Sequence, residues 1–397
     1  MRVMVQDRTF DAIPAACGGP GTLRAASIAT RAFFLIAGVG MASWAPMVPF
    51  AKARLELDDA RLGIVLLCMG FGSTGAMPLA SFLSHRYGNR MVMTTSALLI
   101  CALLPLLTAA SSAVLLGSGL VFFGGSLGTL DVAMNAHAVE VEKLHGQPLM
   151  SGFHALFSLG GLAGSAGVAA LLGAGVPLVA CAVAVSCLLA VVVAAQTRKL
   201  IGLEKVDEGA AQRTMFALPS STALLLGCLC LVVFLAEGAM LDWSAVFLRS
   251  LRGFDISGAG LGYAAFSIAM ASGRLLGDRL IVALGPTRVV RHGSLLAAAG
   301  FLLATALPWA ATSLAGFFLV GLGAANIVPV LFSAAGRLPG TAPGVSIATV
   351  TALGYSGMLA GPALIGFIAQ ATSLPLALSG IAVSLLVVAA CAAIVRR

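Results

Sequence analysis

The chain has 397 residues, of which 59% are hydrophobic and 10% are charged. A soluble domain carries roughly 25% charged residues, so the composition excludes a water-soluble globular protein. The net charge is +8, but the basic residues are dispersed over the ends of apolar segments and form no patch with interleaved aromatic residues, which excludes a nucleic-acid-binding surface.

Residues 1–26 contain Pro14, the run Gly18-Gly19-Pro20-Gly21 and scattered charges, without the apolar core of a signal peptide, so we predict a disordered cytoplasmic tail. Apolar segments of about 20 residues, the length that spans a bilayer as a helix, follow to the C-terminus. We predict twelve spans, with boundaries good to a few residues: 27–50, 61–84, 91–110, 113–138, 148–172, 176–197, 219–248, 257–283, 287–309, 312–336, 343–371 and 374–395.

The charged stretch 198–218 lies at the middle of the chain, between the sixth and the seventh span. We therefore predict an all-α membrane protein with two six-helix halves, 27–197 and 219–397, joined by a cytoplasmic linker. The eight cysteines lie mostly inside apolar segments, so we expect them to serve packing, with no metal and no cofactor.

The orientation follows from the distribution of lysine and arginine, which favours cytoplasmic loops. With the N-terminus in the cytoplasm, 18 of the 23 basic residues fall on the cytoplasmic side and 5 on the other. We therefore predict that both termini are cytoplasmic. This topology indicates a multi-pass membrane protein.

An internal repeat relates the halves. Trp44 and Trp243 are 199 residues apart, and Leu62 and Leu261 keep the same separation. The separation becomes 197 for the segment Gly160–Gly164, which aligns with Gly357–Gly361. Two parallel repeats are expected to hold a substrate site between them near the middle of the membrane, and to expose it to each side in turn as one half rocks against the other.

The second and the eighth predicted spans end in similar short polar sequences, each of which leads into a cytoplasmic loop. The first holds His85, Arg86, Gly88 and Arg90, and the second holds Arg274, Asp278 and Arg279. Arg274 and Asp278 are four residues apart on one helical face, so we expect them to pair. We interpret both loops as a cytoplasmic latch that gates the protein; plain anchoring by positive charge is the alternative.

These loops resemble the signature G-x-x-x-D-[RK]-x-G-[RK]-[RK] of the major facilitator superfamily, which the second loop matches through Gly277-Asp278-Arg279. In the first loop, His85 stands at the aspartate position and Ser81 at the first glycine. Residues 131–140, 151–161 and 242–249 are similar to the MosC-like subgroup of that family. The resemblance covers residues 27–395 and implies a secondary transporter with twelve helices. Together with the short loops and the two arginines at the end of the chain, it suggests a bacterial inner membrane. The antiporter motif G-P-x-x-G-G is not matched at Gly160-Gly161, which weakens a drug-efflux interpretation.

Charged groups inside the spans are the candidates for function, because a carboxylate at the centre of a membrane helix costs roughly 2.5–3.5 kcal/mol. Asp131 and Asn135 share a helical face, and His154 lies at a similar depth in the next span, so we expect the three to meet. A histidine beside a carboxylate could carry a proton. The alternative is a structural hydrogen-bonded cluster between helices.

Span seven contributes Glu237, with Asp242 and Trp243 nearer the outside. We expect no basic residue to match these buried carboxylates in mid-span. Trp44 and Trp243 are predicted to line the cleft and stack on a solute, with an interfacial aromatic belt as the alternative.

Asn326 and Tyr355 are mid-span groups that could contact a ligand or join helices. The predicted substrate-binding residues are therefore Trp44, Asn135, Glu237, Trp243, Asn326 and Tyr355. The predicted proton-coupling residues are Asp131, His154, Glu237 and Asp242. A further polar group at the end of span four is expected to be mostly solvated or to gate: His137, Glu140, Glu142, Lys143 and His145.

The leading hypothesis is a monomeric transporter that moves a small polar solute, such as a sugar or polyol, with protons. Its partners are then the solute, protons and the lipid bilayer. One alternative is an efflux antiporter for drugs or metabolites, and another is a membrane sensor that transports nothing. We expect no enzymatic activity, because no nucleophile–base pair appears, and no ATP-driven transport, because the chain lacks G-x-x-x-x-G-K-[ST].

Overall fold

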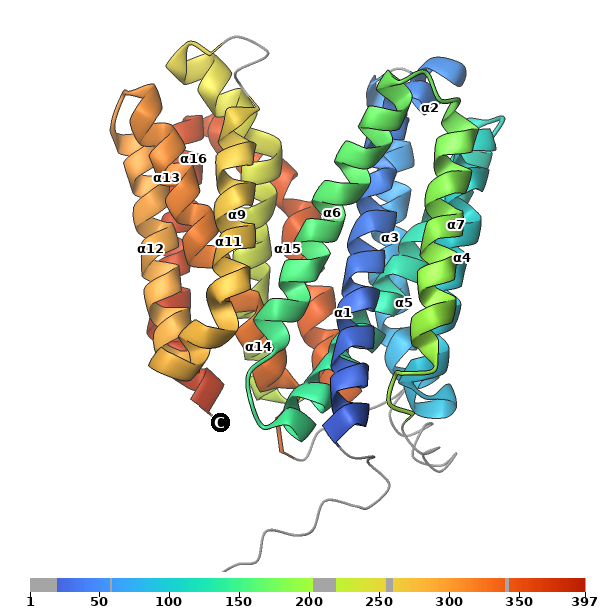
Figure 1. Ribbon diagram of the computed structural model, residues 1–397. Helices are drawn as coiled ribbons and strands as arrows, with labels where there is room; N and C mark the ends of the chain where they lie inside the picture. The colour runs from blue at the N-terminus through green and yellow to red at the C-terminus, as the bar shows by residue number, and fades with distance from the viewer. Residues whose placement is uncertain (1–19, 58, 203–218, 255–259, 340–342, 397) are drawn as a thin grey trace, which may run out of the picture.

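The computed structural model describes residues 20–57, 59–202, 219–254, 260–339 and 343–396, and within them the regular structure is helical (Figure 1). The N-terminal half contains α1 (Pro20–Ser43), η1 (Ala45–Met47), α2 (Val48–Arg54), α3 (Asp59–Tyr87), α4 (Asn89–Ala109), α5 (Ala113–His145), α6 (Met150–Gly173) and α7 (Leu178–Thr197). The C-terminal half contains α9 (Ser221–Arg252), α11 (Leu261–Leu284), α12 (Pro286–Ala306), α13 (Ala310–Ala324), α14 (Ile327–Ala335), α15 (Pro343–Ala371), α16 (Leu374–Cys391) and η2 (Ala392–Arg396).

Eleven stretches of helix within the described residues are long and apolar enough to cross a membrane, judged by length and composition. The remaining predicted span is α11, which is not among them and carries Arg274, Asp278 and Arg279. It still packs against α9, α12 and α13 as a member of the second bundle. The predicted all-α membrane architecture is therefore confirmed.

The beginning of α1 and the C-terminal η2 lie at the same end of the two bundles (Figure 1). The turns after α3, α5 and α11 lie at that end too, and basic residues counted as cytoplasmic lie beside them, among them Arg86, Lys143 and Arg288. We call this the basic end and the other the opposite end.

The helices of the two halves pair in the same way. α1 packs on α6 as α9 packs on α15, α3 packs on α5 as α11 packs on α13, and α4 packs on α7 as α12 packs on α16. The halves meet through α6 with α11 and α3 with α15, again equivalent pairs. The repeat found in the sequence is therefore a repeat in space.

The turns after α3 and α11 are nearly identical. Gly88 has φ 81° and ψ 147°, and Gly285 has φ 80° and ψ 154°, a conformation that side chains with a Cβ rarely adopt. Each glycine N–H donates to the carbonyl four residues earlier, at 2.9 Å in both turns. Because Gly88 and Gly285 are 197 residues apart, the turns align residue n of the first half with residue n + 197 of the second.

At the opposite end of each half, an arginine caps the C-terminus of a helix. Arg54 donates to the carbonyls of Leu107 and Thr108 where α4 ends. Arg252 donates to the carbonyls of Ala304 and Leu307, at 2.9 and 2.8 Å, where α12 ends. Such C-terminal carbonyls have no partner inside their own helix, and a guanidinium supplies several donors at once.

Some predicted boundaries need correction. α1 begins at Pro20, so residues 20–26 are helical and do not belong to a disordered tail; residues 1–19 lie outside the described residues. α5 continues to His145, seven residues beyond the predicted end of span four, because its charged last turns are held by buried contacts. Most of the predicted linker, 203–218, lies outside the described residues.

Candidate functional site

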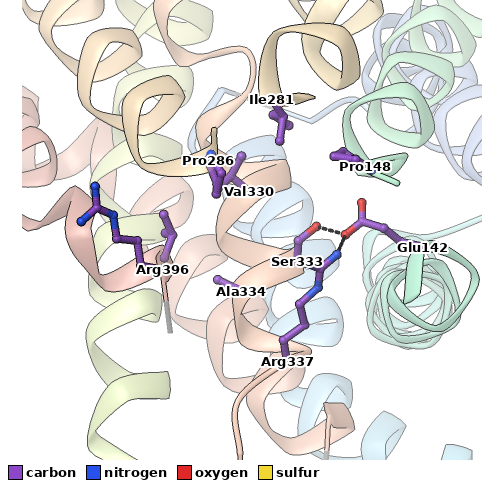
Figure 2. Close-up of a pocket in the computed structure, with 10 residues that line it drawn as sticks. Glu142, Pro148, Ile281, Pro286, Val330, Ser333, Ala334, Arg337 and Arg396 are labelled. Carbon is purple, nitrogen blue, oxygen red and sulfur yellow. Dashed lines mark hydrogen bonds and ion pairs between the residues drawn. The ribbon is translucent and has the colours of Figure 1, made fainter. Parts of the chain in front are cut away.

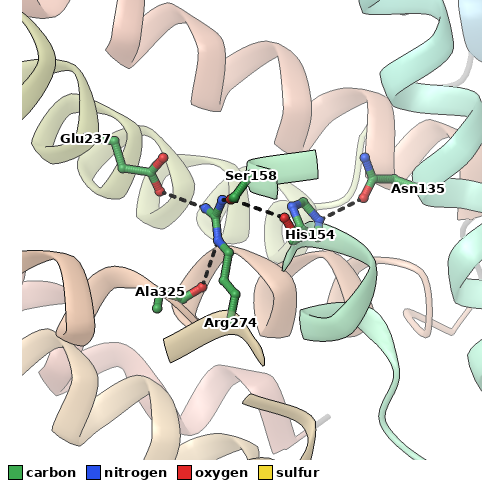
Figure 3. A network of polar contacts seen from close by, with 6 residues as sticks. All are labelled: Asn135, His154, Ser158, Glu237, Arg274 and Ala325. Carbon is green, nitrogen blue, oxygen red and sulfur yellow. Dashed lines mark hydrogen bonds and ion pairs between the residues drawn. The ribbon is translucent and has the colours of Figure 1, made fainter. Parts of the chain in front are cut away.

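Arg274 lies near the middle of α11 and is 6% exposed. Its Nη1 donates to Ser158 Oγ at 2.7 Å, its Nη2 lies 3.4 Å from Glu237 Oε1, and its Nε donates to the carbonyl of Ala325 at 3.2 Å. Ser158 belongs to the N-terminal half and the other two partners to the C-terminal half (Figure 3). The expected pairing of Arg274 with Asp278 is wrong, and so is the expectation that no basic residue matches the buried carboxylates.

The carbonyl of Ala325 is available because of a proline. In an uninterrupted helix this carbonyl would accept from the residue four positions later, which is Pro329 and has no N–H. The predicted tenth span is accordingly broken into α13 and α14 at this point. Arg274 donates to this carbonyl, which has no partner within its own helix, so the helix break helps to position the guanidinium.

Asp131, Asn135 and His154 meet as predicted. Asn135 Nδ2 donates to Asp131 Oδ1 at 3.2 Å, and Asn135 Oδ1 lies 3.1 Å from His154 Nε2. With the amide in this orientation, Nε2 carries the hydrogen of the imidazole. The ring packs between Phe34 and Phe332, with centroids 5.2 and 5.7 Å away. Because the amide stands between them, the histidine contacts Asn135 and not the carboxylate.

These groups form one network across the molecule. Ser158 Oγ accepts from Arg274 and donates to the carbonyl of His154 at 3.2 Å, which links the Asn135–His154 pair to the Arg274–Glu237 pair (Figure 3). Tyr355 of α15 packs edge-on against Phe234 of α9, with ring centroids 5.5 Å apart. A buried cluster with one arginine and two carboxylates thus lies between the halves.

The other predicted site residues lie apart from this network. Trp44 is 3% exposed within the hydrophobic core of the N-terminal half, and Trp243 packs toward Gly366 of α15. Asp242 is exposed on α9. Asn326 is 5% exposed and donates to the carbonyl of Gly273 at 2.9 Å, which joins the helix break to α11.

Asp278 caps a helix of the opposite half. Its two carboxylate oxygens accept from the backbone N–H groups of Ser151 and Gly152, at 3.0 Å each, in the first turn of α6. A helix N-terminus carries partial positive charge and N–H groups without intrahelical partners, so a carboxylate is favourable there. The contact joins α11 to α6 at the basic end.

Glu142 makes a second connection at the basic end and is 2% exposed. One oxygen accepts from the N–H groups of Leu149 and Met150, at 2.8 and 3.0 Å. The other accepts from Ser333 Oγ at 2.8 Å and from Arg337 Nη2 at 2.6 Å (Figure 2). Glu142 therefore holds the start of α6 and binds the C-terminal half at once. The expectation that it is solvated is wrong, as it is for His137, which is 1% exposed and accepts from the N–H of Ile201 at 3.0 Å.

The first-half loop is built differently. The alignment set by Gly88 and Gly285 places Ser81, and not His85, opposite Asp278. A Cβ added to Gly344 in the first turn of α15 would lie 2.9 Å from Ser81 Oγ and 3.6 Å from His85 Nε2, so this loop also faces the beginning of a helix in the other half. It brings no carboxylate to that helix.

The remaining residues of the predicted latch lie in or beside these two loops. Arg86 is exposed and donates Nε to its neighbour Tyr87 at 3.3 Å. Arg90 is half-buried at the start of α4, and Arg279 is exposed on α11.

Comparison with known proteins identifies the family. The model of the Major Facilitator Superfamily matches residues 32–362. The chain belongs to the major facilitator superfamily. It is 47% identical to an uncharacterised transporter of this superfamily from Yersinia pestis, over 93% of this chain and 96% of the relative. It is 34% identical to the membrane protein MosC of Rhizobium meliloti, over 91% of this chain and 88% of MosC.

Among solved structures, the fold is similar to that of the E. coli fucose:proton symporter FucP, with a TM-score of 0.75 and 16% identity, over 92% of this chain and 97% of FucP. A second FucP structure, in the outward conformation, gives a TM-score of 0.77 over 93% of this chain and 97% of that chain. The chain is therefore a member of a family of membrane transporters.

Two structural features of the candidate site were not predicted from the sequence. The contact of Glu142 with Arg337 joins residues 195 positions apart, and their separation in sequence gives no indication of it. The placement of Arg274 had one detectable signal, namely Pro329 in the middle of an apolar span, which predicts a broken helix with a free carbonyl.

Proposed function

We propose that this protein is a secondary active transporter that moves a small polar solute, such as a sugar or polyol, through the space between its halves by alternating access. In this proposal the basic end faces the cytoplasm, both termini are cytoplasmic, and the protein works as a monomer in a bacterial inner membrane. The observation that carries the proposal is that the buried guanidinium of Arg274 bonds to both halves, to Ser158 in one and to Glu237 in the other. A solute that binds to this network therefore acts on contacts that change when one half moves against the other.

The described contacts fit one state of such a cycle. Among the described residues, the hydrogen bonds between the halves are made by Glu142, Ser158 and Asp278 as acceptors, all in the half of the bundle toward the basic end. We assign this arrangement to the state that is closed toward the cytoplasm. Opening that side then requires the Asp278 and Glu142 contacts to break.

We propose proton coupling at the Glu237–Arg274 pair, with Asp131 as a second acidic site. A proton on Glu237 removes its negative charge, so Arg274 loses its ionic partner and can turn toward a hydroxyl or carbonyl of the solute. Loss of the proton restores the pair. The similarity of the fold to that of FucP, a fucose:proton symporter, supports this proposal.

Transport by purified protein in liposomes tests the proposal. A library of sugars, polyols, amino acids and cationic drugs is first screened for thermal stabilisation, and a compound that stabilises the protein is used as solute. We expect uptake of a polar solute to rise several-fold when a pH gradient is imposed. Equal uptake rates with and without the gradient would rule out proton coupling. If only cationic drugs stabilise the protein in the screen, the result would favour an efflux transporter.

The variant Glu237→Gln separates coupling from binding. We expect it to retain solute exchange across the membrane and to lose accumulation driven by the pH gradient, because glutamine keeps the shape of the side chain but takes no proton. Glu56→Gln is the control, since Glu56 is exposed in the turn after α2. Proton-driven accumulation that survives in Glu237→Gln would contradict the role of this residue.

A further inference from the structure

A cavity of about 380 Å³ lies at the basic end, beside the contact of Glu142 with Arg337 (Figure 2). The N-terminal half supplies Glu142 and Pro148 to its wall, from the end of α5 and the turn before α6. The rest of the wall comes from the C-terminal half, from α11, α12, α14 and the C-terminal η2. Its volume is in the range of small-molecule sites, and it is distinct from the network around Arg274.

The charges around this cavity do not balance. Glu142 accepts four hydrogen bonds, two from backbone N–H groups and two from Ser333 and Arg337, so its carboxylate needs no further partner. It offsets the charge of Arg337. Arg396, from η2, also lines the cavity and is exposed, and it has no hydrogen-bond or ion-pair partner within the described chain. The cavity therefore has a surplus positive charge.

The donors and the walls together indicate a ligand class. Arg337 is 49% exposed and uses only Nη2 toward Glu142, so its other N–H groups, like those of Arg396, remain for a ligand. Val330, Ala334 and Val395 add an apolar wall. Guanidinium groups bind phosphate through paired, charge-assisted hydrogen bonds, and the apolar wall accommodates a short carbon chain.

We propose that this cavity is a binding site for a phosphate ester, either the headgroup of an anionic phospholipid or a soluble phosphomonoester. Because both halves form its wall, the site is complete only while the basic end is closed. A ligand that binds one conformation stabilises that conformation by its differential affinity. Within the proposed transport cycle, on which this consequence alone rests, occupancy holds the protein closed toward the cytoplasm and slows turnover.

Thermal unfolding of the detergent-solubilised full chain tests a soluble ligand, with sn-glycerol 3-phosphate as the probe and glycerol as its uncharged counterpart. We expect the phosphate ester to raise the unfolding temperature and glycerol to leave it unchanged. Arg396→Gln is expected to weaken the apparent affinity by roughly tenfold, since one charge-assisted contact is lost. The matched control is Arg291→Gln, because Arg291 is exposed on α12 and does not line the cavity.

A second arm tests the lipid. The chain and both variants are compared in nanodiscs of phosphatidylglycerol and of phosphatidylcholine. Stabilisation by phosphatidylglycerol that Arg396→Gln abolishes and Arg291→Gln keeps assigns the site to a lipid headgroup. The same pattern with glycerol 3-phosphate alone assigns it to a soluble ester.

A third variant, Ala334→Phe, fills the cavity without a change of charge and is expected to abolish either effect. The proposal is overturned if neither probe stabilises the protein, or if the two arginine variants respond alike. Both readouts measure binding, so the site stands or falls separately from the transport function.

Discussion

The substitution Asp278→Asn tests the closure of the basic end most directly. The carboxylate accepts two backbone N–H groups at 3.0 Å, from Ser151 and Gly152. Asparagine retains one acceptor oxygen and no charge. One hydrogen bond to a charged group contributes about 1.5–3 kcal/mol, and a charge at a helix N-terminus about 0.3–1 kcal/mol. With part of the contact retained, we expect a loss of about 2 kcal/mol from the closed state, or roughly 30-fold in the opening equilibrium.

Hydrogen–deuterium exchange of backbone amides measures this shift in the opening equilibrium of the basic end. In Asp278→Asn, amides at residues 151–153 lose a partner directly, so their faster exchange alone is not decisive. The decisive reporter is residues 333–339, which contain the Ser333 and Arg337 side of the Glu142 contact and do not bond to Asp278. Faster exchange there reports opening of the whole basic end.

The control is Arg279→Gln, since Arg279 is exposed and adjacent to Asp278 on α11. We expect exchange in this variant to match the wild type. Unchanged exchange at residues 333–339 in Asp278→Asn, or an equal increase in Arg279→Gln, would refute the role of Asp278 in closure.

Two further predictions concern packing between helices. Ser81→Asp places a carboxylate at the start of α15 as Asp278 does at α6, so we expect slower exchange at the basic end and slower transport; faster exchange would show that the two loops are not equivalent. Gly160→Ala puts a Cβ 2.4 Å from the carbonyl of Leu35, so we expect about 1–3 kcal/mol of destabilisation and a lower unfolding temperature. Gly167→Ala meets nothing within 4 Å and should be neutral by the same measurement.

The twelve helices and their division into halves could be predicted from the sequence because they depend on local properties. Segment length and hydropathy decide whether a stretch crosses a bilayer. The meeting of Asp131, Asn135 and His154 was predictable for a similar reason. The first two share a face of one helix, and the third lies at the same depth in the next helix along the chain.

Arg274 shows where this reasoning fails. A separation of four residues permits its pairing with Asp278, but both side chains reach partners on other helices instead: Glu237 and Ser158 for the arginine, and the start of α6 for the aspartate. Which neighbour a long side chain reaches depends on the rotation of its helix against the others. That rotation is set by packing and does not appear in the spacing of residues along one helix.

The loops after α3 and α11 show the same limit for the alignment of the two halves. The sequence motif aligns His85 with Asp278, whereas the matched turns at Gly88 and Gly285 align Ser81 with Asp278. By itself, the sequence determined that the protein is a two-fold repeat of membrane helices with polar groups at mid-depth, because hydropathy and periodicity act locally. Only the tertiary structure decided which polar groups meet across the halves, because those contacts depend on how the two bundles are placed against each other.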